Sequence, residues 1–507
     1  MTTKHISAAA ACLVMTSLIW SPATNAADST SNPQYIRAKA ALEQALNRPQ
    51  PARHARNIIL FIGDGMGINS VTAGRIFAGQ SLGRDGASYQ LSFETLSYTG
   101  LSKTYSADKL VTDSANGISA ITTGVKTLNA AIGVDDSVVA KDCPSALATR
   151  IVTIAERAHQ AGLATGVVTT AGLTDATPAG AYGHVPFRGW RADTDLPPEA
   201  VAAGCTDLAR QLVEAPDDLR LDVALGGDLE DFLPKGQGAG KRLDGRDLTQ
   251  TWRTQKDARV VYDAPQLSAL DPHAPGRVLG LFAADDLPSP VDVADHAGVP
   301  DLTAMTVSAI DLLAQHPQGY FLLVESASID KWHHKNNAYR ALTDVNELSK
   351  AVQAAMDRTD PRDTLIIVTA DHSHGLVISA GSTREEPILG LVRNHGVLMP
   401  DGNGQPRTTL SYATGPGGPR NGAAFVIPDE AATLSPDYHQ PALTYLDSAQ
   451  HAGEDVPVYA RGPCADLLTG TFESNYIHQV MIYALGLDQP SPLAKPQSGP
   501  KIGRKHP

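Results

Sequence analysis

The chain has 507 residues, of which 42% are hydrophobic and 19% charged, a composition typical of a folded globular protein. Its formal charge of −13 argues against the basic surface that a nucleic-acid-binding protein needs. If the substrate is an anion, local cations must overcome this overall charge.

Residues 1–26 read as a secretory signal. Lys4 and His5 precede an apolar stretch over 6–20, and small residues over 23–26 offer a cleavage site. The apolar stretch contains serine and threonine and is shorter than the roughly 20 residues that a membrane span needs. We find no other stretch that could span a bilayer. We therefore expect an exported protein, periplasmic or secreted, without a membrane span.

Three apolar runs predict strands that are covered on both faces. They occupy residues 57–62, 320–324 and 364–370 and are rich in Ile, Leu and Val. Helical patterns lie between them, such as residues 150–161, which lead into a further strand over 164–169. This alternation favours an α/β fold whose large sheet is mainly parallel and flanked by helices.

Polar side chains follow the three buried strands. Asp64 comes after the first, Glu325 after the second, and Asp371-His372 after the third. Because the carboxyl ends of parallel strands meet at one edge of a sheet, we expect these residues to form one site. Each has a simpler explanation when read alone: a tight turn for Asp64, a helix cap with a surface histidine for Asp371-His372.

Further candidate ligands follow nearby. Asp330 and His334 are four residues apart, so in a helix they share one face and can bind one cation, although a polar loop is the alternative. Asp175 and Thr177 follow the strand over 164–169, in a stretch that an ordinary turn would also explain. Carboxylates and histidines without cysteine ligands suit zinc and magnesium.

Ser114 is the candidate nucleophile. It lies at the predicted start of a helix, where free N–H groups and the helix dipole favour an anion. Alone it would be read as a helix cap. Two metal ions roughly 4 Å apart could ionise it and clamp a phosphoryl group. Arg188, on a predicted loop, could hold two phosphate oxygens.

The remaining chain suggests several segments around an α/β core over 56–384. We expect an N-terminal arm over 27–55, an insertion over 385–450 rich in Gly, Pro and Asn, a return to the core over 451–487, and a loose tail over 488–507. The insertion should contain a strand over 423–427, and the chain should end its fold with a helix near residues 476–485.

Three cysteines remain once the signal removes Cys12. They are Cys143, Cys205 and Cys464, so at most one intramolecular disulfide can form. Pairing of Cys143 with Cys205 is plausible because both lie in loop-like sequence, but the spacing cannot choose among the three pairs.

Six ordered sequence blocks between Asn57 and Leu487 resemble those of the alkaline phosphatases. They are 62–67, 111–127, 175–179, 325–334, 369–372 and 451–455. The resemblance implies the α/β core of that family, with the insertion corresponding to a crown at a homodimer interface. It also implies hydrolysis of phosphate monoesters through a covalent phosphoserine, with two zinc ions and one magnesium ion.

The resemblance assigns a role to each candidate residue. Ser114 would be the nucleophile, Arg188 would grip the phosphate, Asp113 would cap the helix or orient Arg188, and Lys331 would contact phosphate through water. The first zinc would take Asp330, His334 and His451, and the second Asp64, Asp371 and His372. Magnesium would take Asp64, Asp175, Thr177 and Glu325.

Different positions resemble different branches of the family. Asp175, Thr177 and Lys331 resemble the enteric bacterial pattern, whereas Cys143 and Cys205 fit a disulfide of the animal branch. Animal members have a further calcium site near a Gly-Leu-Phe-Glu segment. Here Gly280-Leu281-Phe282 is followed by Ala283, so the glutamate of that pattern is missing. The alternatives are a phosphodiesterase or sulfatase on the same metal platform, or a phosphate- or metal-binding protein without turnover.

Overall fold

The computed structural model describes residues 52–487, apart from 380, 421–422, 424–426 and 428. The predicted signal, nearly all of the N-terminal arm, the C-terminal tail and most of the predicted strand over 423–427 lie outside the described residues. Those predictions therefore remain untested. Among the described helices, none combines the length and the apolar character that crossing a membrane requires.

A ten-stranded sheet with mostly parallel neighbours confirms the predicted fold class. The strands follow the order β17-β2-β16-β8-β1-β7-β3-β4-β6-β5, and β16 runs antiparallel to both of its neighbours. They are β1 (Asn57–Gly63), β2 (Tyr98–Lys103), β3 (Ala164–Gly172), β4 (Val223–Gly227), β5 (Arg259–Val261), β6 (Val278–Leu281), β7 (Tyr320–Ser326), β8 (Thr364–Thr369), β16 (Val456–Arg461) and β17 (Gly470–Glu473).

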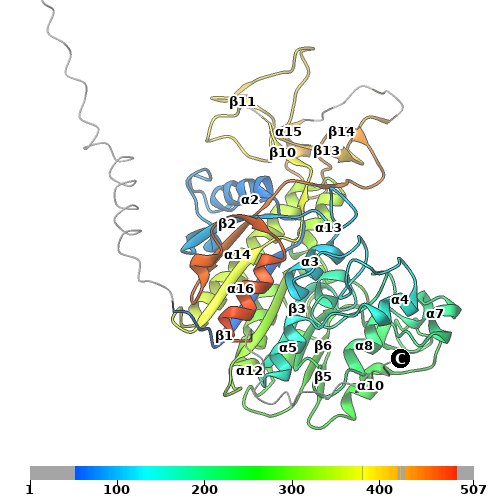
Figure 1. Ribbon diagram of the computed structural model, residues 1–507. Coiled ribbons are helices and arrows are strands. Elements are labelled where there is room, and N and C mark those ends of the chain that lie inside the picture. The colour runs from blue at the N-terminus through cyan, green and yellow to red at the C-terminus, as the bar shows by residue number, and fades with distance from the viewer. Residues whose placement is uncertain (1–51, 380, 421–422, 424–426, 428, 488–507) are drawn as a thin grey trace, which may run out of the picture. The chain divides into compact units, whose positions relative to one another are not determined.

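Helices cover both faces of this sheet (Figure 1). One face packs against α2 (Ile68–Ser81), α12 (Leu302–Leu313) and α14 (Ala338–Arg358). The other packs against α3 (Ser114–Thr123), α5 (Ile154–Gln160), α8 (Leu208–Val213), α10 (Leu248–Arg253) and α16 (Tyr476–Ala484). The other α-helices of the described residues are α4 (Cys143–Ala148), α6 (Ala176–Ala179), α7 (Pro198–Ala202), α9 (Leu229–Phe232), α11 (Ala264–Ser268), α13 (Ser328–His334) and α15 (Glu430–Thr433).

The apolar run of β1 is explained by its place in the middle of the sheet. Its side chains alternate between the two faces. Ile58, Leu60 and Ile62 belong to the core beneath α3 and α16, while Ile59 and Phe61 belong to the core beneath α14. Since both faces are covered, every position must be apolar and no polar alternation is visible in the sequence.

The four central strands β8, β1, β7 and β3 run parallel and lie side by side. Their carboxyl ends are therefore at one edge of the sheet, as the sequence predicted. The helix predicted over 150–161 is shorter than expected and begins at Ile154. Thr153 caps it, because its hydroxyl accepts from the Glu156 N–H while the Glu156 carboxylate accepts from the Thr153 N–H.

The predicted insertion carries its own small sheets, β10-β13-β14 and β11-β12 (yellow to orange in Figure 1). The strands are β10 (Leu376–Ile378), β11 (Arg393–Asn394), β12 (Val397–Leu398), β13 (Leu410–Gly415) and β14 (Ala442–Tyr445). Because β10 precedes residue 385, the three-stranded sheet starts upstream of the predicted insertion. A further pair, β9 (Ser373–His374) and β15 (His451–Ala452), lies at the carboxyl end of β8.

Of the three possible cysteine pairs, the structure forms Cys143–Cys205 and leaves Cys464 as a buried free thiol. The bond joins the start of α4 to the segment before α8, 62 residues further along the chain. A disulfide of this kind is typical of proteins that fold in an oxidising compartment.

Candidate active site

Ser114 is the first residue of α3 and is 2% exposed. Asp113 caps this helix by accepting a hydrogen bond from the Asn116 N–H at 3.3 Å. Gly117 lets the helix approach the end of β8, since an added Cβ would lie 2.8 Å from the Asp371 carbonyl oxygen. Ser114 therefore stands at the start of α3, and Gly117 lets this part of the helix lie against Asp371 at the end of β8.

The first cluster consists of Asp64, Asp371 and His372, all buried at the ends of β1 and β8. His372 Nε2 lies 3.2 Å from Ser114 Oγ, 3.3 Å from Asp64 Oδ1 and 3.5 Å from Asp371 Oδ2. The other ring nitrogen, Nδ1, faces the carbonyl oxygen of Ser373 at 3.3 Å. A carbonyl only accepts, so Nδ1 carries the proton and Nε2 presents a lone pair.

This arrangement is not a Ser-His-Asp triad. In a triad the carboxylate accepts from the ring nitrogen that points away from the serine. Here both carboxylates lie on the Nε2 side, together with Ser114. The convergence of two carboxylates and an imidazole lone pair on one point is instead the donor set of a metal ion.

The second cluster consists of Asp330 and His334 on α13, His374 on β9 and His451 on β15. His334 Nδ1 donates to the Ala449 carbonyl at 2.6 Å, and His451 Nδ1 to the Thr112 carbonyl at 3.0 Å. Both Nε2 atoms therefore carry lone pairs, yet they face each other at 3.2 Å. Two lone pairs in this position require a proton or a cation between them.

His374 belongs to this cluster, although the sequence analysis did not single it out. Its Nε2 lies 2.8 Å from Asp330 Oδ1, and β9 pairs with β15 so that His374 stands opposite His451. The sequence could have indicated His374 by its position two residues after His372, because residues two apart in a strand point to the same side.

The carboxylates of the site repel one another. Burial, followed by the charges of Asp371, Asp330 and Glu325, raises the pKa of Asp64 well above its usual range. Burial also raises the pKa of Glu325 to about 8 and that of Asp371 to about 7. The cost of ionising several carboxyl groups in one buried site indicates that cations belong there.

Unpaired buried atoms point the same way. Asp64 Oδ1, Asp371 Oδ2 and Thr177 Oγ1 have no hydrogen-bond partner among the described residues. Buried polar atoms are otherwise almost always paired. Asp64 and Asp371 point into the first cluster, while Thr177 lies on α6, directly after the end of β3. The donor chemistry therefore fits divalent cations.

Asp175 and Glu325, the other predicted magnesium ligands, have partners of their own. Glu325 accepts from Thr169 Oγ1, and Asp175 Oδ1 caps α6 by accepting from the Ala176 N–H at 2.8 Å. Burial opposes ionisation of Asp175, but the charges of Lys331 and Arg188 hold its pKa well below its usual range. Among the described residues, the metal-ligand clusters are the two named above and do not include this third set.

Arg188 lies between two carboxylates, 2.8 Å from Asp175 Oδ1 and 3.4 Å from Asp113 Oδ2. Lys331 Nζ lies 3.1 Å from Asp175 Oδ2 and also contacts Asp286. Arg188 contacts Asp113, which caps the helix that carries Ser114, and Asp175 joins Lys331 to Arg188. They supply the local positive charge that the acidic chain otherwise lacks.

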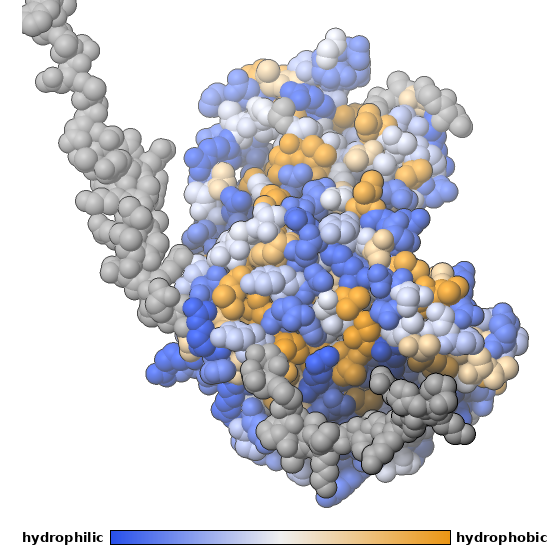
Figure 2. All heavy atoms as spheres, in the orientation of Figure 1, coloured by the Kyte–Doolittle hydropathy of each residue, from blue (hydrophilic) through white to orange (hydrophobic). Residues whose placement is uncertain are grey.

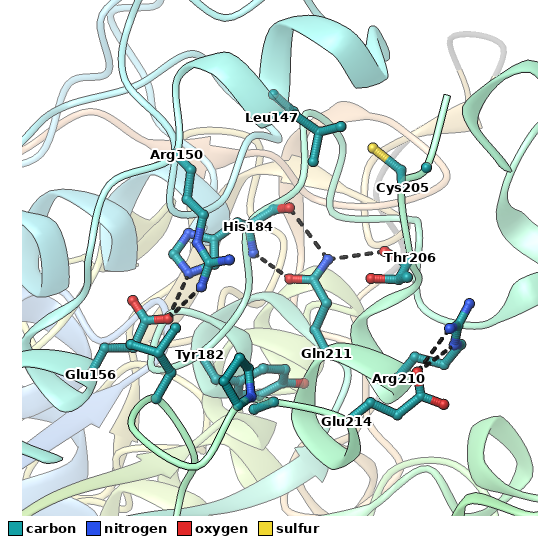
Figure 3. Close-up of a pocket in the computed structure, with 15 residues that line it drawn as sticks. Leu147, Arg150, Glu156, Tyr182, His184, Cys205, Thr206, Arg210, Gln211 and Glu214 are labelled. Atoms are coloured by element: carbon teal, nitrogen blue, oxygen red, sulfur yellow. Dashed lines mark hydrogen bonds and ion pairs between the residues drawn. The ribbon is translucent and has the colours of Figure 1, made fainter. Parts of the chain in front are cut away.

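A separate cavity of about 210 Å³ lies beside the disulfide (Figure 3). Its polar side chains pair with one another: Glu156 contacts His184 and Arg150, and Glu214 contacts Arg210. With these charges already paired, the cavity shows no chemistry that calls for a ligand.

The fold and the two clusters define a metal-dependent hydrolase built on an α/β sheet. The family model described as alkaline phosphatase matches residues 55–487. The tissue-nonspecific alkaline phosphatase of Gallus gallus is 37% identical over 470 residues, which cover 89% of each chain. The human tissue-nonspecific isozyme is 35% identical over 479 residues, covering 90% of this chain and 89% of the relative.

The solved alkaline phosphatase of Thermus thermophilus is also similar, with a TM-score of 0.62 and 26% identity over 88% of this chain and 94% of that one. The chain belongs to the alkaline phosphatase family. It is a phosphomonoester hydrolase, and its buried or partly buried His and Asp clusters are metal-binding groups typical of that family. This confirms the function predicted from the six sequence blocks.

Proposed function

We propose that this alkaline phosphatase acts through a phosphoserine at Ser114, with two zinc ions and one magnesium ion. Asp330, His334 and His451 would hold the first zinc, and Asp64, Asp371 and His372 the second, since mixed imidazole and carboxylate sets suit zinc. Asp64, Asp175, Thr177 and Glu325 would hold magnesium, which prefers oxygen ligands. When bound, the ions would favour ionised Ser114 and offset negative charge on the leaving oxygen.

Phosphoryl transfer then requires the chain to position one phosphate group. Arg188 would hold two of its oxygens, and its ion pairs with Asp113 and Asp175 would orient the guanidinium group. The free N–H groups at the start of α3 would face a third oxygen, because a helix N-terminus binds anions. Lys331 would contact the phosphate through water.

Two displacements complete the reaction. The Ser114 oxygen loses its proton and bonds to phosphorus as the bond to the alcohol oxygen breaks, and the departing alcohol gains a proton. A water oxygen then bonds to phosphorus and gives up a proton as the bond between phosphorus and the Ser114 oxygen breaks, so inorganic phosphate leaves and the Ser114 oxygen regains a proton. Because the folded site already holds the reacting groups together, the entropic part of the activation barrier is lower.

The observation that carries this proposal is the position of Ser114 beside the first cluster. Its Oγ lies 3.2 Å from the lone pair of His372 Nε2, which also faces Asp64 and Asp371. A protein that only binds phosphate or metal would need no hydroxyl nucleophile at this point. The same contact predicts that Ser114 and the three residues of the first cluster take part in the same reaction step.

The test is to trap the intermediate. Metal-replete protein incubated with labelled inorganic phosphate at acidic pH should carry label on Ser114. Ser114→Ala should lose both the label and turnover of a chromogenic monoester, whereas Ser137→Ala, on an exposed serine, should keep both. Turnover that survives in Ser114→Ala, or that resists chelation, would contradict the mechanism.

We also propose a homodimer formed through the insertion. Apolar residues reach the surface of this segment (Figure 2). Leu443 is 78% exposed and Val397 is 65% exposed. Exposed apolar patches often mark protein interfaces. Sedimentation should give twice the chain mass, and Leu443→Asp with Val397→Asp should shift the protein toward monomer. A wild-type monomer at micromolar concentration would refute this assembly.

Export is proposed on two grounds, the signal-like residues 1–26 and the Cys143–Cys205 disulfide. Protein recovered from outside the cytoplasm should begin near residue 27 when its N-terminus is sequenced. Full-length protein retained in the cytoplasm would argue against it.

A further inference from the structure

Asp286 is a partly buried carboxylate with no role in the mechanism described above. It lies in the loop after β6, and its Oδ1 accepts from the Gly172 N–H at the end of β3, at 3.2 Å. The same carboxylate contacts the ammonium group of Lys331. Asp286 therefore connects the backbone of β3 to a cation on α13.

This contact is the outer end of a row of alternating charges. Asp286 contacts Lys331, Lys331 contacts Asp175, Asp175 contacts Arg188, and Arg188 contacts Asp113. Asp113 caps α3, which begins with Ser114. We call these five residues the charge row. It leads from a surface loop to the nucleophile helix.

We propose that Asp286 is a positioning residue that holds the Lys331 ammonium group at its place in the charge row and limits the positive charge offered to phosphate. The inference rests on the proposed roles of Lys331 and Arg188. Without Asp286, Lys331 would be restrained by Asp175 alone, and the phosphate site would gain one unit of positive charge.

The loop around Asp286 is held without its side chain. The Leu287 N–H donates to the Thr170 carbonyl at 3.0 Å, and the Asp285 carbonyl accepts from the Asp228 N–H at 2.9 Å. An asparagine at position 286 would still accept from the Gly172 N–H through its amide oxygen. The charge can therefore be removed while the backbone contacts stay in place.

The raised pKa of Lys331 agrees with an ammonium group that contacts both Asp175 and Asp286. Burial alone would lower its pKa, but the charges of Asp175 and Asp286 raise it above the usual lysine value. Lys331 is only 28% exposed, so water screens these charges incompletely. Removing one of the two carboxylates should consequently be felt by an anion bound nearby.

The experiment compares Asp286→Asn with Asp285→Asn in metal-replete enzyme. Asp285 is the adjacent acid, and its side chain is 67% exposed and 3.8 Å from Arg191 rather than in contact with Lys331. We expect Asp286→Asn to lower the inhibition constant of inorganic phosphate about three- to tenfold, and KM with it, because of the extra positive charge. Asp285→Asn should change both constants by less than about half as much.

A double variant tests whether Asp286 affects phosphate binding through Lys331. If Asp286 acts through Lys331, Asp286→Asn should have little further effect on the phosphate inhibition constant in a Lys331→Ala background. An unchanged or higher inhibition constant in Asp286→Asn, or an equal change in Asp285→Asn, would overturn the inference while Lys331→Ala still weakens phosphate binding. If Lys331→Ala has no effect, the proposed role of Lys331 itself fails.

Discussion

Chelation should make the folded protein progressively less stable between pH 7 and pH 9. Without cations, Asp371 and Glu325 remain buried carboxyl groups with pKa values of about 7 and about 8. Their ordinary values are 3.8 and 4.5. The folded protein therefore keeps protons that the unfolded chain has released, and it loses stability as rising pH removes them.

The size of the effect follows from these pKa values. Over pH 7 to 9 the linkage relation gives a loss of about 1.4 kcal/mol for Glu325 and about 0.4 kcal/mol for Asp371. Glu325 dominates because its folded pKa lies in the middle of the interval. Asp64, whose pKa is also raised by burial and by Asp371, acts in the same direction. The total is therefore about 2 kcal/mol or more.

The assay is chemical denaturation of chelated protein at pH 7, 8 and 9 and constant ionic strength. Metal-replete protein should show a much smaller slope, because bound cations replace the protons. Glu325→Gln should reduce the loss between pH 7 and pH 9 in the chelated protein by about 1.4 kcal/mol. Glu199→Gln, on the exposed side of α7, serves as the matched control and should leave it intact.

The opposite outcome is easy to recognise. If chelated wild-type protein becomes more stable as pH rises, or if Glu325→Gln keeps the full slope, the carboxyl groups are not held protonated in the folded state. The reasoning that assigns these residues to cations would then lose its electrostatic basis.

Three further predictions concern other contacts of the site and fold. Arg188→Lys keeps the charge but loses the planar fork, so kcat/KM for a monoester should fall about 10- to 100-fold, and an unchanged value would exclude two-oxygen binding. His374→Ala should weaken zinc binding about 10- to 100-fold in a chelator competition, since His374 hydrogen-bonds to Asp330, a proposed zinc ligand; an equal affinity would show that this contact does not affect metal binding. Cys143→Ser with Cys205→Ser should destabilise the protein by about 4 kcal/mol from loop entropy, measured by urea unfolding, with little change in kcat.

The sequence alone indicated which residues follow the buried strands and which share a helix face, because that information is local. A strand covered on both faces must be apolar, so the first polar residue after it marks the sheet edge, as at Asp64 and Asp371. Asp330 and His334 share a helix face because four residues make about one turn, and α13 confirms this spacing.

Tertiary structure decided what depends on contacts between distant segments. Which strands are neighbours follows from packing over hundreds of residues, and only the order β8-β1-β7-β3 shows that the ligand-bearing ends meet. His374 joins the second cluster through the pairing of β9 with β15, and Lys331 meets Asp286 across 45 residues of chain. No local pattern encodes such contacts, because their partners are chosen by the whole core. The choice of Cys143–Cys205 among three pairs has the same cause.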